Sequence, residues 1–259
     1  MITNAFDPNS PAIIQLRPAE DRLKCDACIV TFSDVIEQYV LNRYPCREFA
    51  QERNACGPTP VYSLEYKGRT LAFYKTLIGA PAAVGLLEGV AMLVDTKKFV
   101  VFGGAGCLDR EIAHGRVMVP DRAYRDEGAS YHYAAPADYI GLPHAGVVAK
   151  FLADRGIPHV TGGTWTTDAF YRETETNFQR RKAEGCVSVE MECTALQAMC
   201  DFRGYELYYF LTSGDLLDAP QWDPRSEGDS LTGTQHDMTH FDLAAELACF
   251  ISAQPAHHT

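Results

Sequence analysis

Acidic side chains in two segments of the chain are placed where they could do chemistry. Asp215, in Thr212-Ser-Gly-Asp215, follows a short apolar run that predicts a strand, Leu207–Leu211. At the end of a strand a carboxyl group can act as a general acid that gives a proton to a leaving group, or it can simply cap a turn or a helix. The residues around Asp215 leave both alternatives open.

The second acidic segment, Val189-Glu-Met-Glu192, opens a predicted amphipathic helix that extends to Phe202. A carboxylate at this place can accept two hydrogen bonds from a cis-diol such as ribose O2′ and O3′. The alternative is that Glu190 and Glu192 only interact with the positive end of the helix dipole. Taken alone, the pattern favours this second interpretation.

A glycine motif, Gly103-Gly-Ala-Gly106, follows the predicted strand Phe99–Phe102. Glycines allow a ligand to approach the backbone closely, and exposed N–H groups can hold an anion. A dinucleotide-binding loop would need a further glycine at position 109, which is Asp109, so the motif disfavours a dinucleotide. Without a ligand, the motif would be a tight turn.

Two cysteine and histidine patterns fall short of a metal site. Cys25 and Cys28 have the spacing of half a zinc site, but no second Cys or His pair accompanies them. His236 and His240 have the spacing of a zinc-binding helix, but Asp237 stands where Glu would be expected. We therefore expect no metal and no organic cofactor.

The bulk properties exclude several classes of partner. A net charge of −11 without a cluster of Lys and Arg disfavours nucleic acid. No apolar stretch is long enough to span a membrane, and the first fifteen residues lack the pattern of a secretory signal. The nine scattered cysteines then indicate reduced thiols, which predicts a cytoplasmic protein.

Predicted strands and helices alternate along the chain. Besides the segments already named, we expect strands at 28–32, 61–66, 70–75, 117–119 and from 159, helices from Ser33 and at 82–94, 144–153, 174–184 and 237–251, and irregular backbone at 43–60 and 218–234. The alternation predicts an α/β fold with a central mixed sheet flanked by helices on both faces. We expect one domain, 1–259, with a lead-in segment 1–24 and a frayed tail 254–259. In such folds ligands bind beyond the carboxyl ends of the strands.

The order of the motifs is more specific than any one of them. Phe99–Leu108, Gly115–Val119, Asp126–Tyr133, Thr167–Phe170, Val189–Glu192 and Ser213–Asp215 follow one another as they do in the nucleoside phosphorylase and nucleosidase family. The chain resembles this family from about Cys28 to Asp215, and from Phe99 to Tyr133 it is similar to uridine phosphorylases without a gap. Glu192 and Asp215, 23 positions apart, match the family's ribose-binding Glu and catalytic Asp.

The resemblance implies a role for each matching residue in cleaving a nucleoside between base and ribose. Glu192 would hold the ribose hydroxyl groups, with Met191 packed on the sugar and Glu190 nearby. Phe170 would stack on the base, as aromatic faces do. Asp215 would protonate a ring nitrogen, which favours a purine, and Thr174 and Thr176 replace the Gln and Arg that recognise uracil in uridine phosphorylases.

The side of the site that would hold the nucleophile departs from the family pattern. Phosphorolysing members carry a Gly-Asp-Pro-x-x-Arg-type loop after the first strand, but Thr31–Ile36 contains neither Gly nor Arg. Val101 stands in place of an Arg, and Gly104 in place of a Ser or Thr. The usual phosphate donors are therefore absent, and a dianion without guanidinium partners binds poorly.

Other residues could supply what these positions lack. The possible anion donors are Lys75, Arg110 and Arg53, of which the last resembles an arginine lent by a neighbouring subunit. The glycine motif also resembles that of the hydrolytic nucleosidases, in which an acid after the first strand activates water. Asp34 lies roughly at that position.

Three functions are compatible with these patterns. The first is phosphorolysis of a nucleoside to free base and ribose 1-phosphate, with phosphate as co-substrate. The second is phosphate-independent hydrolysis, and the third is a non-catalytic relative that binds or stores a nucleoside. Because family members are usually dimers or hexamers with sites completed across interfaces, the resemblance also implies a homodimer or a homohexamer.

Overall fold

The computed structural model describes residues 1–113, 115–218 and 240–253. The strands are β1 Leu23–Lys24, β2 Ala27–Thr31, β3 Arg47–Asn54, β4 Gly57–Tyr66, β5 Arg69–Lys75, β6 Val94–Asp95, β7 Lys98–Cys107, β8 Val117–Asp126, β9 Tyr139–Gly141, β10 His159–Thr167, β11 Cys186–Glu190 and β12 Glu206–Leu216. The helices are α1 Asp34–Arg43, α2 Ala80–Ala91, α3 Arg110–Ala113, α4 Ala145–Asp154, α5 Glu175–Ala183, α6 Cys193–Arg203 and α7 His240–Ser252, with short 3₁₀ helices η1 Ile2–Asn4, η2 Ala129–His132 and η3 Phe170–Arg172. His236, the tail 254–259 and almost all of the predicted polar loop 218–234 lie outside the described residues.

One mixed sheet forms the centre of the molecule, with its strands in the order β11, β10, β8, β12, β7, β2, β5, β4, β3. Strands β5, β2, β7 and β12 pair in parallel, whereas β3, β4 and β5 are joined antiparallel. β11 also pairs with β7, with Ser188 opposite Cys107 and Val189 opposite Gly106. The strands from β11 to β7 therefore close into a ring, and β3 lies at the free edge of the extension.

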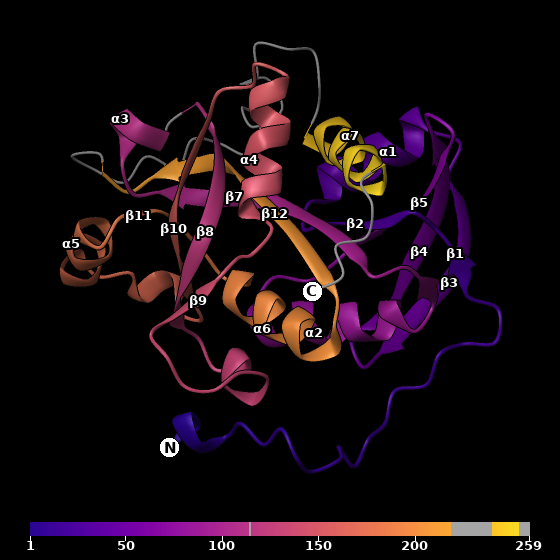
Figure 1. Cartoon of the computed structure of the whole chain (residues 1–259), viewed down its shortest axis with the longest axis horizontal. Helices are drawn as coiled ribbons and strands as arrows, with labels where there is room; N and C mark the ends of the chain where they lie inside the picture. The colour runs from indigo at the N-terminus through magenta and orange to yellow at the C-terminus, as the bar shows by residue number, and fades with distance from the viewer. Residues whose placement is uncertain (114, 219–239, 254–259) are drawn as a thin grey trace.

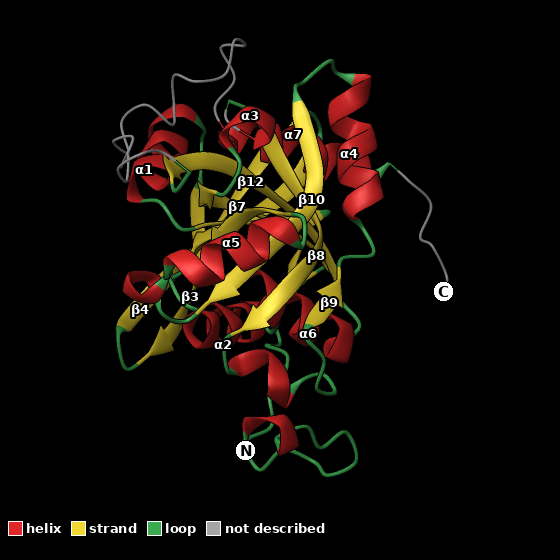
Figure 2. Ribbon diagram, turned by 90° about the vertical axis from the view of Figure 1, so that its left-hand side faces the viewer, coloured by secondary structure: helices red, strands yellow, loops and turns green. Residues whose placement is uncertain are grey.

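Helices cover both faces of this sheet, as the alternation of elements predicts (Figures 1 and 2). In Figure 1, α1, α4 and α7 lie above the strands, and α2 and α6 lie below them. The sheet is almost entirely apolar where helices cover it: Ile29, Phe73 and Val100 are fully buried, as are Phe99 and Phe210. Two-sided burial of this kind explains why the central strands are continuous apolar runs.

Local signals in the sequence explain where several elements begin. Ser33 caps α1, because its hydroxyl oxygen accepts a hydrogen bond from the Ile36 N–H. The predicted strands 61–66 and 70–75 are confirmed within β4 and β5, which form a hairpin around Lys67-Gly68, and both turn residues have the positive φ that such a tight turn requires. The predicted strand 28–32 is also confirmed, within one residue, as β2.

The prediction of irregular backbone at 43–60 is wrong, because this stretch contains β3 and the beginning of β4. No residue of β3 is buried, and charged side chains occur on both of its faces. The strand is at the edge of the sheet, where polar residues are tolerated and protect the unpaired side. It therefore lacks the alternation of apolar and polar residues that marks a half-buried strand.

The predictions around the glycine motif also need correction. Gly103, Gly104 and Gly106 do not end the strand or form a turn, because β7 continues through them to Cys107. Pairing continues because β12 lies on one side and β11 on the other. Likewise β12 extends past Leu211 to Leu216, with a register irregularity between Ser213 and Leu216 that contains Asp215.

The sequence suggests that the segment Val189–Glu192 opens a helix, but the structure shows that it does not. Val189 and Glu190 end strand β11, and Glu192 is the N-cap residue of α6. Sequence analysis missed β11 because it is only five residues long and has no alternation, being buried along its whole length.

Close packing, rather than a positive φ angle, explains the last glycine of the motif. A Cβ atom at Gly106 would lie 2.5 Å from Leu217 Cδ1 and 2.8 Å from Val189 Cγ1, whereas one at Gly104 would meet no atom within 4 Å. We expect Gly106→Ala to lower the free energy of unfolding by about 1–3 kcal/mol. Gly104→Ala is the matched control and should change it by less than about 0.5 kcal/mol. Urea unfolding of both variants tests this, and equal losses would contradict it.

Candidate active site

The predicted site residues Glu190, Glu192 and Asp215 come together where β7, β11 and β12 end. β11 ends at Glu190, beside the glycine motif of β7, and Asp215 lies in the irregular end of β12 on the other side of that motif. The Oδ1 atom of Asp215 is 3.3 Å from the position that a Cβ on Gly106 would take. The absence of a side chain at Gly106 therefore allows the two acidic segments to approach each other.

Glu190 is a buried carboxylate that accepts hydrogen bonds from four donors. Oε1 accepts from the Thr166 hydroxyl at 2.5 Å, and Oε2 accepts from the backbone N–H groups of Glu192 and Cys193, both at 2.7 Å. The Tyr209 hydroxyl donates to Oε2 at 3.3 Å. Such a carboxylate occupies the positive end of α6 and fixes the turn that carries Glu192.

Glu192 bridges the starts of two helices. Its Oε1 atom accepts a hydrogen bond of 2.6 Å from the Gly79 N–H, although the two residues are 113 positions apart. Gly79 is the N-cap residue of α2 and has a φ of 101°, a conformation that favours glycine. The N-terminus of α2 therefore points its positive end at this carboxyl group, whereas the first N–H groups of α6 donate to Glu190.

The two glutamates cannot both ionise easily in this place. Burial raises the pKa of Glu192, and the charge of Glu190 raises it further. Burial also raises the pKa of Glu190, although its hydrogen-bond donors oppose the change. Because Glu190 has more donors, a proton held by the pair resides on Glu192.

A second hydrogen-bonded acid connects α6 to the loop after β8. Glu127 is buried and accepts from the Ser130 N–H at 3.0 Å and from the Thr194 hydroxyl, also at 3.0 Å. Nearby, Asp168 accepts from the Gly128 N–H at 3.0 Å, and burial raises its pKa. These contacts hold the end of β10 against the start of α6.

The aromatic residue predicted to stack on a base lies just after β10. Phe170 begins η3, and 42% of its surface is exposed although it is a large apolar residue. Its ring meets that of Tyr171 edge-on, with centroids 4.9 Å apart. An exposed aromatic face of this kind is available to a planar ligand.

Lys75 and Asp34, from the ends of two neighbouring strands, form an ion pair with each other. Lys75 ends β5, and Asp34 follows β2, which pairs with β5. The Lys75 ammonium contacts the Asp34 carboxylate and lies 3.5 Å from Glu37 Oε2. The hydrogen bond with Asp34 raises the pKa of Lys75, so this amine stays charged. Phe32, from the same loop as Asp34, packs on Gly103.

The two other possible anion donors lie apart from Lys75. Arg53 is exposed on the edge strand β3, where its Nη2 donates to Gln51 Oε1 at 3.0 Å. Arg110 begins α3 with an exposed side chain, and its backbone N–H donates to Asp218 Oδ2 at 3.1 Å. The fold of one chain thus brings Lys75 and Asp34 together but does not bring Arg53 to them.

Sequence reasoning missed several residues of this site. Gly79, Thr166, Tyr209 and Glu127 supply or fix the contacts of Glu190 and Glu192, but each is far from them in sequence. Gly79 alone had a local signal, since Gly-Ala-Pro marks a helix start with Pro in the first turn. The others are ordinary strand and loop residues.

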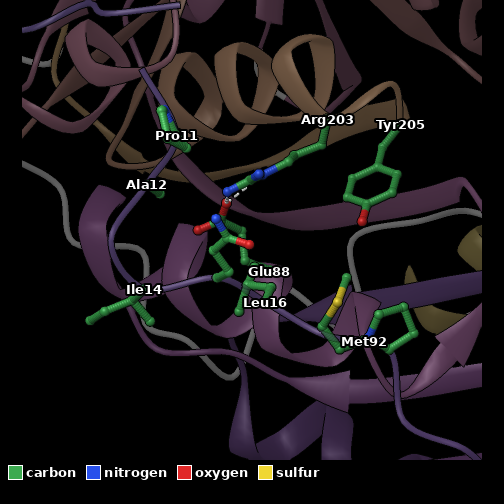
Figure 3. Close-up of a pocket in the computed structure, with 10 residues that line it drawn as sticks. Pro11, Ala12, Ile14, Leu16, Glu88, Met92, Arg203 and Tyr205 are labelled. Atoms are coloured by element: carbon green, nitrogen blue, oxygen red, sulfur yellow. Dashed lines mark hydrogen bonds and ion pairs between the residues drawn. The ribbon is translucent and has the colours of Figure 1, made fainter. Parts of the chain in front are cut away.

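A separate hollow lies at the other end of α2 and α6. Both helices begin at the site described above, and their last turns carry Glu88, Met92 and Arg203, which line this hollow together with Tyr205 (Figure 3). Its remaining wall is the lead-in segment around residues 11–18. A twelve-residue helix is about 18 Å long, so this hollow is distant from Glu192.

Comparisons with known proteins agree with this fold. Residues 27–248 match the phosphorylase superfamily, and the chain belongs to this family of nucleoside phosphorylases. It is 25% identical over 184 residues to the purine nucleoside phosphorylase DeoD-type of Bacillus subtilis (strain 168), covering 69% of this chain and 74% of that one. It is 24% identical over 147 residues to the guanosine phosphorylase of Halorubrum lacusprofundi, covering 56% of this chain and 60% of the relative.

A solved structure supports the fold independently. The uridine phosphorylase from Vibrio fischeri ES114 matches with a TM-score of 0.68 and 24% identity, over 86% of this chain and 90% of that one. The predicted α/β architecture and the family resemblance are therefore confirmed. Within the described residues, no helix combines the length and the apolar character needed to cross a membrane.

The buried acid Glu192 predicts a pH-dependent cost in stability. In an unfolded chain such a group ionises near 4.5, whereas the folded protein raises its pKa. Above pH 4.5 the folded state therefore binds more protons, and stability falls as the pH rises until the folded pKa is passed. Glu192→Gln keeps an oxygen for the Gly79 N–H and removes this cost. We expect the variant to melt at a higher temperature than the wild type at pH 8.

The difference should shrink towards pH 5, and thermal unfolding followed by circular dichroism at both pH values measures it. Each unit of pKa shift corresponds to about 1.4 kcal/mol. Glu175→Gln, which changes an exposed glutamate on α5, is the control and should show no such pH-dependent gain. A Glu192→Gln protein less stable than wild type at pH 8 would contradict the raised pKa.

Proposed function

We propose that this protein cleaves the N-glycosidic bond of a purine ribonucleoside and transfers the ribosyl group to phosphate, giving free base and ribose 1-phosphate. The observation that carries the proposal is the buried Glu192 carboxyl group, which begins α6 and is held by the N-terminus of α2, close to the glycine motif of β7 that Asp215 of β12 also borders. Relatives named as purine nucleoside phosphorylase and guanosine phosphorylase support the same reaction class.

In this proposal the ribose binds at Glu192. The O2′ and O3′ hydroxyl groups donate to the Glu192 carboxylate, so binding of the diol requires loss of the proton that the pair holds. Met191 packs on the sugar, and Glu190 fixes the turn through the backbone N–H groups of Glu192 and Cys193. A substrate held in this way needs little further ordering before its bond breaks.

The base binds on the opposite side of Gly106. Phe170 stacks on its face, and Asp215 donates a proton to a ring nitrogen as the bond between that base and C1′ breaks. The electron pair of the bond stays with the base, and positive charge develops on the sugar. The carboxylates around the sugar stabilise that charge electrostatically.

Phosphate is the proposed nucleophile. Lys75, at the ends of β2 and β5, is the proposed hydrogen-bond donor that holds it. A second candidate is hydrolysis by water, and the contacts of Lys75 with Asp34 and Glu37 are the observation that favours it. A phosphate dianion must compete with these two carboxylates for the ammonium, whereas a water molecule can be activated by Asp34.

We further propose a cytoplasmic homodimer or homohexamer in which a neighbouring chain lends Arg53.

Base release in phosphate-free buffer, with and without added phosphate, distinguishes the two reactions. The proposal predicts that release from purine nucleosides requires phosphate and yields ribose 1-phosphate. Lys75→Met should then raise the KM for phosphate by about tenfold or more, because an ion pair of this kind is lost. Release at the same rate without phosphate, with free ribose as product, would establish hydrolysis, and Asp34→Asn should then be the damaging variant.

The role of Asp215 can be tested on the same reaction. Asp215→Asn leaves a side chain of the same shape that cannot give up a proton, so we expect kcat to fall by about 10²–10⁴-fold. The KM for nucleoside should change much less, since Glu192 and Phe170 remain. Asp218→Asn, three residues away in an ion pair with Lys182, is the control. If the wild type binds nucleosides but releases no base under any condition, the protein is the non-catalytic relative instead.

A further inference from the structure

Glu88, in the last turn of α2, is a carboxylate that the mechanism above does not use. Its Oε1 atom accepts hydrogen bonds from Arg203 Nε at 2.8 Å and from Arg203 Nη2 at 2.6 Å, and Arg203 is the last residue of α6 (Figure 3). Its Oε2 atom accepts from the Tyr133 hydroxyl group, at the end of η2, at 2.9 Å. Burial, and then the charge of Glu88, raise the pKa of Tyr133, so its hydroxyl group stays a donor. One side chain therefore joins α2, α6 and η2.

Glu88 is better shielded from water than most surface carboxylates. Only 13% of its side chain is exposed, and the lead-in segment around residues 11–18 forms the facing wall of the hollow that it lines. That segment is itself fixed to the end of α2, because the Ala19 N–H donates to the Met92 carbonyl oxygen at 2.9 Å. Salt screens a shielded ion pair less than an exposed one, so its geometry is held more firmly.

The same three elements meet again at the candidate active site. The Gly79 N–H, just before α2, donates to Glu192 Oε1 at 2.6 Å, and Glu192 is the N-cap residue of α6. The Thr194 hydroxyl group, in the first turn of α6, donates to Glu127, whose other carboxylate oxygen accepts from the Ser130 N–H of η2. Hydrogen bonds therefore join α6 to α2 and to η2 at both of its ends.

Contacts at both ends fix how far α2 can slide along α6. The two helices pack against each other, but apolar contacts have no preferred direction and tolerate small shifts. A hydrogen bond is less tolerant, because it is lost once donor and acceptor are more than about 3.5 Å apart. A slide of α2 by the rise of one residue, about 1.5 Å, is enough to break the bond between Gly79 and Glu192.

We propose that Glu88 is a positioning residue for the carboxyl group of Glu192. By holding Arg203 and Tyr133 at the far end of α2, Glu88 sets the register of α2 on α6 and so keeps the Gly79 N–H on Glu192. The carboxyl group is then held in the orientation that the ribose hydroxyl groups need. The effect on ribose rests on the proposed function, whereas the link from Glu88 to Gly79 does not.

The test compares adenosine, inosine and guanosine with their 2′-deoxy counterparts in wild type and in Glu88→Ala. A deoxynucleoside lacks one of the two hydroxyl groups assigned to Glu192, so the ratio of kcat/KM for the ribonucleoside to that for the deoxynucleoside reports how well this carboxyl group is placed. We expect Glu88→Ala to lower the ratio by about threefold or more, through the KM for the ribonucleoside rather than through kcat. Glu88→Gln still accepts hydrogen bonds from both donors and should restore most of the ratio.

Glu246 provides a matched control in another part of the molecule. Its side chain is also 13% exposed, and it accepts a hydrogen bond of 2.9 Å from the Tyr66 hydroxyl group and contacts the Lys67 ammonium. These contacts join α7 to the hairpin of β4 and β5. Glu246→Ala therefore removes a carboxylate with the same kinds of partner and should leave the ratio unchanged.

Arg203→Gln removes the same ion pair from its more exposed side. The Arg203 side chain is 34% exposed, so we expect this variant to fold even if Glu88→Ala does not. It should lower the ratio in the same direction. Circular dichroism shows which variants are folded before their kinetics are compared.

Hydrogen–deuterium exchange at the Gly79 amide separates this inference from the proposed function. Because Glu192 is its acceptor, we expect this amide to exchange faster in Glu88→Ala and Arg203→Gln than in wild type or Glu246→Ala. If no nucleoside is cleaved but exchange changes in this way, the link from Glu88 to Gly79 holds and the proposed function fails. Unchanged exchange in the folded variants would overturn the inference, as would an equal change in Glu246→Ala. Faster exchange with an unchanged kinetic ratio, in a protein that cleaves nucleosides, would overturn it as well.

Discussion

Two carboxyl groups, Glu190 and Glu192, are buried next to each other, and the fold must compensate for both. An isolated buried carboxylate is very costly, so each needs donors or a proton. Glu190 receives its donors from β10, β12 and the first turn of α6, and Glu192 receives one from the start of α2. The positions of two helices and two strands are therefore constrained by these acids, and packing alone would tolerate more variation.

The same arrangement divides the site into regions of different charge. On one side, Lys75 is the cation that the structure places near the ends of β2 and β5, and two carboxylates already contact it. On the other side, Asp168 and Glu173 flank Phe170 in the segment after β10, and burial raises the pKa of both carboxyl groups. A neutral planar molecule with hydrogen-bond donors fits the acidic side better than an anion does. This division is consistent with a base on the acidic side and a small oxyanion or water on the other.

Much of the fold could be predicted from the sequence, because buried parallel strands are long apolar runs and helix starts carry local signals such as Ser33. The motif order likewise brought Phe170, Glu192 and Asp215 into one predicted site. The contacts that fix these residues could not be predicted, since Gly79 and Tyr209 meet the glutamates only through tertiary structure. The sequence does not predict β3, because an edge strand with no buried residue has no hydrophobic period. It predicts a turn at the glycine motif, because pairing with β11 leaves no local trace.

The closure of the ring by β7 and β11 has a consequence for the order of folding. The first half of the chain contains β2, β5 and β7, whose parallel pairing needs nothing from the second half. Gly106 can meet Val189 only after β8 and β10, which lie between them in sequence, have been placed in the sheet. Contacts of such long sequence separation carry the largest entropic cost and form late. During synthesis, therefore, we expect the amino-terminal strands to pair well before the chain can bind any small molecule, while α7, which packs on β2, β5 and β7, joins them only at the end.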